Sequence, residues 1–293
     1  MSLALVTKLN DIDLDQAVQT EVTVAGNLSF GDGATATGGG VSPFKEETWE
    51  AMSEGLPDDT PDGNGFYWAN SAAYVRADGY SHSGTKALRV DFATGYQRNR
   101  NQNFFMGRQV SELWIEAYVR ISDGAEDDIG GATEPYADYG GEEGSNNKFL
   151  RIWGADYGTN GGNKGGGSLW RDLGEMKYKG DFSSNQSNTV SPVGTSSITV
   201  TTGDRPGRYL LFQWHGRLAT TVDANDGLLE WYIDGEHVHS ENLDWRSADY
   251  PYWDRGYLMG YINTTYPPSG DPMRVWWDDV KFYDSDPGWD WTL

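Results

Sequence analysis

The sequence contains no cysteine, and its 22 lysine and arginine residues are outnumbered by 44 aspartate and glutamate residues, which gives a formal net charge of −22. Without cysteine the protein has no disulfide framework, no thiolate nucleophile and no zinc site built from Cys ligands. A surface this acidic repels phosphate backbones, so we expect no nucleic-acid partner. The sequence also lacks an apolar run of about 20 residues, the length that a membrane span requires.

Glycine and aromatic residues are abundant instead. The chain has 38 glycines and 13 tryptophans, and Gly, Asn, Asp and Ser interrupt it every few residues. Short strands joined by turns are typical of this composition. An aromatic content of 14% excludes a disordered acidic chain, and 293 residues allow one large β domain or two ordinary ones.

Alternation of apolar and polar residues predicts a series of β-strands. In Leu113–Ile121 the odd-numbered residues are apolar and are predicted to face inward, while Trp114, Glu116, Tyr118 and Arg120 face the other way. Further strands are predicted at Lys86–Phe92, Lys148–Trp153, Ser197–Thr202, Tyr209–Leu218, Leu228–Asp234, Tyr257–Ile262 and Met273–Tyr283. Only Phe44–Met52 is compatible with a short helix. The sequence therefore predicts an all-β protein, an antiparallel β-sandwich or jelly roll.

Three parts of the chain differ in composition. Residues 1–40 are predicted to form an N-terminal arm and Gly-rich linker, residues 41–284 the main domain and residues 285–293 a C-terminal tail. The alternative for residues 1–40 is that they form the first strand and loop of the main domain. Two long loops, Asp123–Asn147 and Asp156–Gly167, are expected either to rim a site or to be solvated decoration.

The C-terminal third carries an ordered set of motifs: Trp214, Asn225-Asp226-Gly227, Trp231–Gly235, Tyr257–Asn263 and Asp278-Asp279-Val280. Asn-Asp-Gly between alternating strands predicts a hairpin, because Asn and Gly tolerate positive φ. With the upstream segments DGYSHSGTKALRVDF and NNKFLRIWG, this order resembles the concanavalin A-like jelly-roll superfamily and, within it, the polysaccharide lyase-like proteins. The resemblance covers about residues 41–284. It implies a sandwich with a concave sheet that lines a groove for an extended polymer, and it bears on fold more than on function.

A polysaccharide lyase must neutralise a uronate carboxylate, remove the C5 proton and protonate the leaving oxygen. These steps need Arg, Asn, Gln or His for the carboxylate and a residue such as His or Tyr for the proton transfers. The candidate catalytic residues of these types on predicted strands are His215, Tyr261, Arg151, Arg120, Gln213 and Asn263.

The resemblance to the alginate-lyase branch implies a strand with Arg, a strand with Gln-x-His and a Tyr-containing strand near the C-terminus. Gln213-Trp214-His215 has the Gln-x-His spacing, but it precedes the Asn-Asp-Gly hairpin. The family pattern belongs on a central strand near Asn147–Trp153, where this sequence has no histidine. That departure counts against lyase activity, and the alternative for His215 is a structural histidine of the sheet.

Aromatic and basic residues supply the candidate carbohydrate-binding set: Trp114, Tyr118, Trp153, Arg217 and Trp231. Aromatic rings stack on the C–H faces of sugars, and the alternative is that they pack in the core. A protein of net charge −22 binds a polyanion only if its cations gather locally. The hypothesis therefore requires one groove that contains Arg120, Arg151, Arg217 and Lys148.

Carboxylates near the C-terminus are candidate metal ligands. Asp278 and Asp279, with Glu50 or Asp91, are predicted to form a calcium site, because hard cations prefer oxygen ligands and the resemblance implies a structural Ca²⁺. The alternative is that they are ordinary surface carboxylates. No cofactor is required for the predicted chemistry.

The sequence thus predicts a carbohydrate-recognising jelly-roll protein, with cleavage of a uronate-containing polymer by β-elimination, as in a polysaccharide lyase, as its candidate activity. Glycosidase motifs of the type Glu-x-Asp-x-x-Glu are absent, so hydrolysis ranks lower. The alternative is a non-catalytic virion-associated protein, a capsid decoration or tail component with a glycan-binding jelly roll, whose residues 1–40 contact other subunits. Met1–Val6 is too short an apolar run for a signal peptide. We expect an extracellular or virion-associated location rather than a cytoplasmic one.

Overall fold

The computed structural model describes a set of segments separated by gaps: residues 28–29, 35–36, 41–69, 73–92, 102–121, 147–154, 164–172, 175–182, 191–193, 199–200, 209–261 and 273–289. The chain divides into two compact units, Met1–Val41 and Ser42–Leu293. In the first unit, β1 (Leu28–Ser29) pairs antiparallel with β2 (Thr35–Ala36). The rest of the predicted arm, like the predicted loop Asp123–Asn147 except its last residue, lies outside the described residues.

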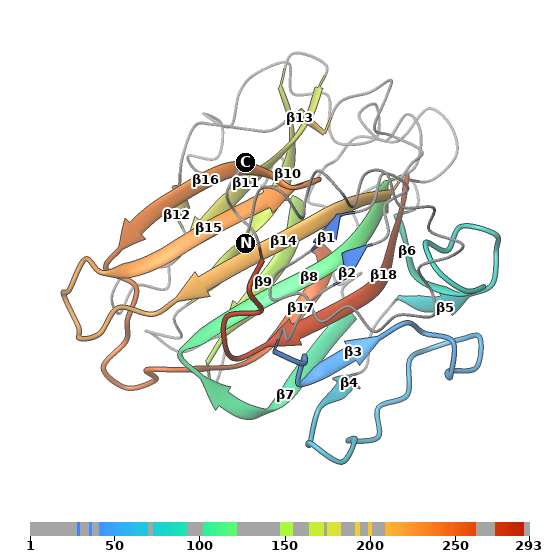
Figure 1. Ribbon diagram of the computed structural model, residues 1–293, viewed down its shortest axis with the longest axis horizontal. Coiled ribbons are helices and arrows are strands. Elements are labelled where there is room, and N and C mark those ends of the chain that lie inside the picture. Colours follow the sequence, from blue (N-terminus) through green and yellow to red (C-terminus); the bar gives the residue numbers. More distant parts are fainter. Residues whose placement is uncertain are drawn as a thin grey trace, which may run out of the picture. The chain divides into compact units, whose positions relative to one another are not determined.

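The second unit consists of two antiparallel sheets, and no helix occurs among the described residues. The first sheet, called sheet 1, has the order β16-β15-β14-β8-β18-β6-β5, with β3 paired to β18 (Figure 1). Its strands are β3 (Lys45–Glu47), β5 (Tyr74–Arg76), β6 (Ala87–Phe92), β8 (Glu112–Ile121), β14 (Tyr209–Arg217), β15 (Gly227–Ile233), β16 (Glu236–Leu243) and β18 (Met273–Tyr283).

The second sheet, called sheet 2, has the order β12-β11-β10-β9-β17-β7-β4, with β13 paired to β11. Its strands are β4 (Tyr67–Ala69), β7 (Gln102–Val110), β9 (Asn147–Trp153), β10 (Gly165–Asp172), β11 (Glu175–Phe182), β12 (Ser191–Val193), β13 (Thr199–Val200) and β17 (Trp253–Tyr261). Strand β9 lies between β10 and β17, so it is a central strand of sheet 2.

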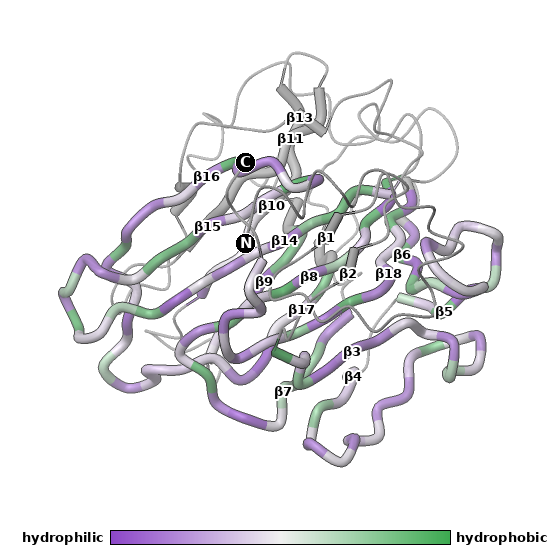
Figure 2. Tube along the Cα trace, viewed as in Figure 1, coloured by the Kyte–Doolittle hydropathy of each residue, from purple (hydrophilic) through white to green (hydrophobic). Residues whose placement is uncertain are grey.

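One core lies between the two sheets. Along β8 the predicted inward residues are all buried, and hydrophobic and hydrophilic residues mix within single strands (Figure 2). Phe149 of sheet 2 packs against Phe212 and Trp277 of sheet 1, with ring centroids 5.2 and 4.6 Å apart. Residues from facing sheets thus fill a shared apolar layer, which makes the unit a sandwich. The predicted antiparallel jelly-roll class is confirmed.

Most of the tryptophan surplus is core. The fully buried large side chains include Trp49, Trp68, Trp214, Trp231, Trp245, Trp253 and Trp277. Glycines give these rings room: a Cβ on Gly165 would lie 1.9 Å from the ring of Trp245. Gly165–Gly167, expected to end a loop, instead begin β10, where Gly165 lies against the indole of Trp245 and Gly166 against the backbone of Leu150 on β9.

Two expectations about local structure were wrong. The stretch Phe44–Met52 contains a strand, β3, rather than a helix, because Lys45–Glu47 pairs with β18 and this pairing outweighs weak helical periodicity. The strands β7, β10 and β11 were not predicted. β7 contains two adjacent phenylalanines and a Gly107 with φ of 67°, which obscure its alternation.

Candidate functional site

The structure divides the candidate catalytic residues between the two sheets. Arg120 lies on β8, and Gln213 and His215 lie on β14, all in sheet 1. Arg151 lies on β9 and Tyr261 on β17, both in sheet 2. Asn263 lies outside the described residues. Arg151 and His215 alternate with core residues of their own sheets, so they lie on opposite outer faces of the sandwich and cannot act on the same bond.

On the outer face of sheet 1, His215 is enclosed by acceptors. Its Nδ1 lies 2.6 Å from Glu230 Oε1, its Nε2 lies 2.9 Å from Glu112 Oε1, and its ring stacks on Trp114 at 4.3 Å. Burial opposes the charge of His215, but the hydrogen bonds to the two carboxylates outweigh burial and raise its pKa. A histidine that donates from both ring nitrogens to carboxylates is an imidazolium and is not available as a general base.

Two further sheet 1 candidates, Gln213 and Tyr118, also have structural partners. Gln213 Nε2 donates to Glu116 Oε2 at 2.9 Å, and Lys281 Nζ donates to the other oxygen of Glu116 at 3.0 Å. Tyr118 stacks on His82 with ring centroids 3.4 Å apart. These contacts join β8, β14 and β18, which is what a side-chain network within a sheet provides.

The outer face of sheet 2 brings a different set together. Core residues Leu150 and Ile152 alternate with Arg151 and Trp153 on β9, so the latter pair faces away from the core. In register, Asn103 of β7 pairs with Tyr257 of β17, and Tyr257 pairs with Arg151. This line of register pairs is called the polar row. Further along the same two strands, beyond a register shift between Leu258 and Tyr261, Tyr261 pairs with Lys148.

A second line of register pairs, called the aromatic row, crosses sheet 2 beside the polar row. Tyr67 pairs with Phe105, Phe105 with Arg255, and Arg255 with Trp153. Tyr67 and Phe105 stack at 4.8 Å and 5°, and the Arg255 guanidinium lies 4.8 Å from the Phe105 ring centre. Tyr67 and Phe105 are half-buried. Half-exposed rings that stack across strands suit the apolar faces of sugars.

Sequence reasoning missed most of these residues. The signal for Phe105 and Asn103 was their parity on β7, opposite to the buried Phe104 and Met106. Tyr67 had no such signal, because β4 spans only Tyr67–Ala69.

The predicted carbohydrate-binding residues are dispersed. Trp231 is fully buried in the core, and Trp114 is covered by His215 on sheet 1. Arg217 is exposed at the end of β14, where its Nη2 donates to the Asp226 carbonyl. Tyr118 faces outward on β8, and Trp153 joins the aromatic row. Since Arg120 and Arg217 lie on sheet 1 while Arg151 and Lys148 lie on sheet 2, the expectation of one basic groove containing all four was wrong.

The predicted metal ligands hold one loop against sheet 1. Asp278 is buried, and its carboxylate accepts from the backbone N–H groups of His82, Ser83 and Asp279. Burial raises the pKa of Asp278 to about 6, and the charge of Asp279 adds to this. Asp279 itself contacts the Ser83 hydroxyl and the His82 ring, each at 2.6 Å.

Glu50 binds the other end of the same loop, at Thr85 and Lys86. Its carboxylate accepts from the backbone N–H groups of Thr85 and Lys86, and the Lys86 ammonium contacts the carbonyls of Glu50 and Met52. No group of three or more His, Asp or Glu residues suited to a metal ion occurs in the described part of the chain. Each of these carboxylates accepts hydrogen bonds from backbone N–H or hydroxyl groups, and calcium binding stays a prediction.

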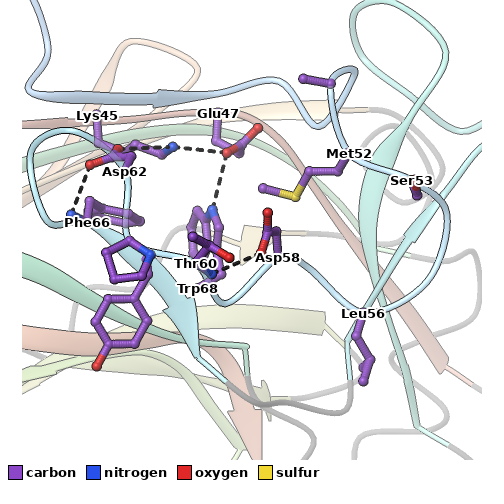
Figure 3. Close-up of a pocket in the computed structure, with 13 residues that line it drawn as sticks. Lys45, Glu47, Met52, Ser53, Leu56, Asp58, Thr60, Asp62, Phe66 and Trp68 are labelled. Carbon is purple, nitrogen blue, oxygen red and sulfur yellow. Dashed lines mark hydrogen bonds and ion pairs between the residues drawn. The ribbon is translucent and has the colours of Figure 1, made fainter.

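A pocket of about 590 Å³ lies beside β3 and β4 (Figure 3). Its charged residues engage one another: Lys45 lies 3.2 Å from Glu47 and 3.6 Å from Asp62, and Glu47 also accepts from Trp68 Nε1 (Figure 3). Tyr67 lines this pocket and also begins the aromatic row.

Replacing Glu47 with alanine is expected to destabilise the protein by about 2–4 kcal/mol, because two buried donors, Trp49 N–H and Trp68 Nε1, would lose their acceptor. Glu46→Ala on the same strand is the matched control, since Glu46 is exposed and should change stability by less than about 0.5 kcal/mol. Urea unfolding measures both. Equal effects of the two substitutions would contradict the role given to Glu47.

The two antiparallel sheets and the core between them form a β-sandwich of the jelly-roll type. Among solved structures, the alginate lyase Aly36B has a TM-score of 0.57 at 13% identity, covering 83% of this chain and 98% of that chain. A mutant of Aly36B in complex with alginate tetrasaccharide has a TM-score of 0.56 at 11% identity, with the same coverage.

An endo-β-1,4-glucuronan lyase from the fungus Trichoderma reesei has a TM-score of 0.52 at 14% identity, covering 84% of this chain and 99% of that chain. No protein-family model matches the chain, and neither does a curated protein. The chain thus has the jelly-roll fold of the polysaccharide lyases, and at these identities the likeness concerns the fold. Within the described segments, no helix is long and apolar enough to cross a membrane.

Proposed function

We propose that this protein is a polysaccharide lyase that cleaves a uronate-containing polymer by β-elimination on the outer face of sheet 2. The observation that carries the proposal is the register of β9 and β17, which pairs Arg151 with Tyr257 and Lys148 with Tyr261. Cationic residues and tyrosines on adjacent strands are the residue types that this chemistry needs.

In the proposed reaction a base removes the C5 proton of the uronate, and the C–H electron pair is delocalised into the carboxylate. This pair then forms the C4–C5 double bond as the C4–O4 bond breaks, and the leaving oxygen O4 keeps the C4–O4 electron pair and takes a proton. Arg151 is assigned to stabilise the charge that develops on the carboxylate. Arg151 is fully buried, so this assignment requires that its guanidinium becomes exposed when a substrate binds.

Tyr261 is assigned the proton transfers, with Lys148 as its cationic neighbour in register. A nearby cation favours an ionised phenol, which is the form that can accept a proton. The Aly36B mutant in complex with alginate tetrasaccharide has a lysine and a tyrosine replaced by alanine. This pairing of residue types supports the assignment of Lys148 and Tyr261.

Binding is assigned to the aromatic row, beside the polar row that holds Arg151. An extended chain lying across β4, β7, β17 and β9 would place sugar faces on Tyr67 and Phe105. Alginate and glucuronan are the substrates of the lyases with this fold named above, and a polymer of uronates is the substrate class proposed here.

The experiment is to incubate the protein with alginate, with glucuronan and with a neutral β-glucan, and to follow the absorbance of the unsaturated product. Product from a uronate polymer and none from the glucan supports the proposal. Binding of uronate oligomers without any cleavage would instead support the non-catalytic glycan-binding alternative. Absence of both would overturn the proposal and leave the virion-associated alternative to be tested through residues 1–40.

A further inference from the structure

A second ordered line of residues crosses the opposite face of the sandwich, on the outside of sheet 1. Register pairs link Tyr74 of β5 to Arg89 of β6, Arg89 to Trp276 of β18, Trp276 to Arg120 of β8, and Arg120 to Tyr209 of β14. Each of these residues alternates with core residues of its own strand. This line, called the arginine ladder, alternates aromatic and arginine residues across the neighbouring strands β5, β6, β18, β8 and β14, whose order can be followed in Figure 1.

Arg120 of the ladder packs against aromatic rings and pairs with no carboxylate of a described residue. The Arg120 guanidinium lies 4.7 Å from the Tyr80 ring centre and 5.7 Å from that of Trp276, and no ion pair joins Arg120 to a described residue. Arg76, beside the ladder on β5, lies 5.1 Å from the Tyr74 ring centre and likewise has no ion pair with a described residue. The Nε atoms of both are buried without a hydrogen-bond partner.

Arg89, which lies between Arg120 and Arg76, is in contrast paired with carboxylates. Its guanidinium pairs with Asp78 and Asp91, each at 2.8 Å, and Asp78 also accepts from Trp276 Nε1 at 3.1 Å. These contacts fix the indole ring on which Arg120 lies. Arg120 and Arg76 are thus two guanidinium groups of one ordered face that have no ion pair with a described residue in a protein of net charge −22, while Asp278 and Asp279 lie near the Tyr209 end of the ladder.

The aromatic surface beside these arginines is accessible. Tyr80 is 44% exposed, packs against Trp276 at 4.9 Å, and is fixed from behind by the Tyr209 hydroxyl, which donates to the Tyr80 carbonyl. At about 4.8 Å between neighbouring strands, the distance from Arg120 across β18 to β5 is about 14 Å. The face is therefore long enough for several successive groups of an extended ligand.

We propose that the arginine ladder is a second binding site, specific for acidic saccharides and separate from the groove on sheet 2. Carboxylates of the saccharide pair with Arg120 and Arg76, and one sugar face stacks on Tyr80. Since the two outer faces point in opposite directions, this site holds a polymer without cleaving it. The ligand class rests on the proposed function, whereas the site itself does not.

The test is isothermal titration of the full chain with a uronate hexamer at low salt, where weak ionic contacts are least screened. The Tyr80→Ala/Arg120→Gln variant should lose one of two binding events, with affinity at that site at least about tenfold weaker. Arg217→Gln is the matched control, because Arg217 is an exposed arginine of the same sheet whose guanidinium contacts a backbone carbonyl. Thermal melting confirms that each variant folds.

The outcomes separate this site from the proposed function. In Arg151→Gln, loss of the groove should leave the ladder event intact, and its affinity should fall as salt rises. If Arg151→Gln removes all binding, or if Tyr80→Ala/Arg120→Gln binds like the wild type, the ladder site is overturned. If titration shows only binding at the arginine ladder and no polymer is cleaved, the proposed function is wrong and the ladder site is supported. Equal binding of a neutral hexamer at the ladder would also overturn its specificity for acidic saccharides.

Discussion

Tyr261→Phe is expected to lower kcat on a uronate polymer by about 100- to 10,000-fold, the range that a positioned general acid–base contributes. The substitution removes only the phenolic hydroxyl, so the strand β17 and its pairing with β9 should persist. KM should change little, because the sugar-binding surface assigned to the aromatic row is untouched. Initial rates of unsaturated-product formation at several polymer concentrations give both constants.

Tyr257→Phe is the matched control for this prediction. It makes the same change on the same strand, at the position that pairs with Arg151 instead of Lys148. The Tyr257 ring packs edge-on against Trp153 at 5.6 Å, so it is expected to act through substrate positioning, with kcat within about tenfold of the wild type. If Tyr257→Phe is inactive while Tyr261→Phe is active, the roles are reversed. If both remain fully active, the proton transfers occur elsewhere.

The face on which a residue lies could be read from the sequence, but the sheet to which its strand belongs could not. The alternation of Leu113–Ile121 correctly gave the outward side for Tyr118 and Arg120. Nothing in the sequence of β14 or β9 tells which sheet each strand joins, because that depends on long-range pairing. For this reason the sequence placed His215 and Arg151 in one candidate site. In the structure β14 pairs with β8 in sheet 1, whereas β9 pairs with β17 in sheet 2.

The tryptophans show a second limit to what the sequence alone predicts. Trp231 shares its parity with Leu229 and Ile233, which are core residues, so its burial was readable from alternation. Composition instead suggested a sugar-binding role, because the count of 13 tryptophans exceeds what one core was expected to hold. The core of this sandwich is large enough to take most of them. The half-buried rings of the aromatic row, Tyr67 and Phe105, lie on a short and an irregular strand, where periodicity gives the weakest signal.

The second large effect concerns stability, and it is expected at His215. Its imidazolium joins β8 to β15 through Glu112 and Glu230 while packing on Trp114. His215→Gln removes the cation and leaves Glu112 and Glu230 on either side of a neutral residue. Breaking a buried ion pair typically costs about 3–5 kcal/mol, and since Glu112 is partly exposed we expect about 2–4 kcal/mol at pH 6.

The direction in which stability changes with pH follows from the direction in which the pKa of His215 is shifted. The pKa of His215 in the folded protein is raised above its usual 6.5, so folding favours the protonated ring. Its contribution to stability is therefore complete below pH 6.5 and is lost as the pH rises through the folded-state pKa. The difference in unfolding free energy between wild type and His215→Gln should shrink over that range. Urea titrations at a series of pH values measure it.

His239→Gln on β16 is the control for this argument. His239 Nε2 pairs with the carboxylate of Glu241, whose side chain is 43% exposed, so that pair should contribute less than about 1 kcal/mol. A difference for His215→Gln that stays constant from pH 5 to pH 9 would mean that packing on Trp114, rather than the charge, carries the effect. A difference that shrinks with pH, and vanishes in the Glu112→Gln/Glu230→Gln background, would identify the imidazolium as the group that ties these strands together.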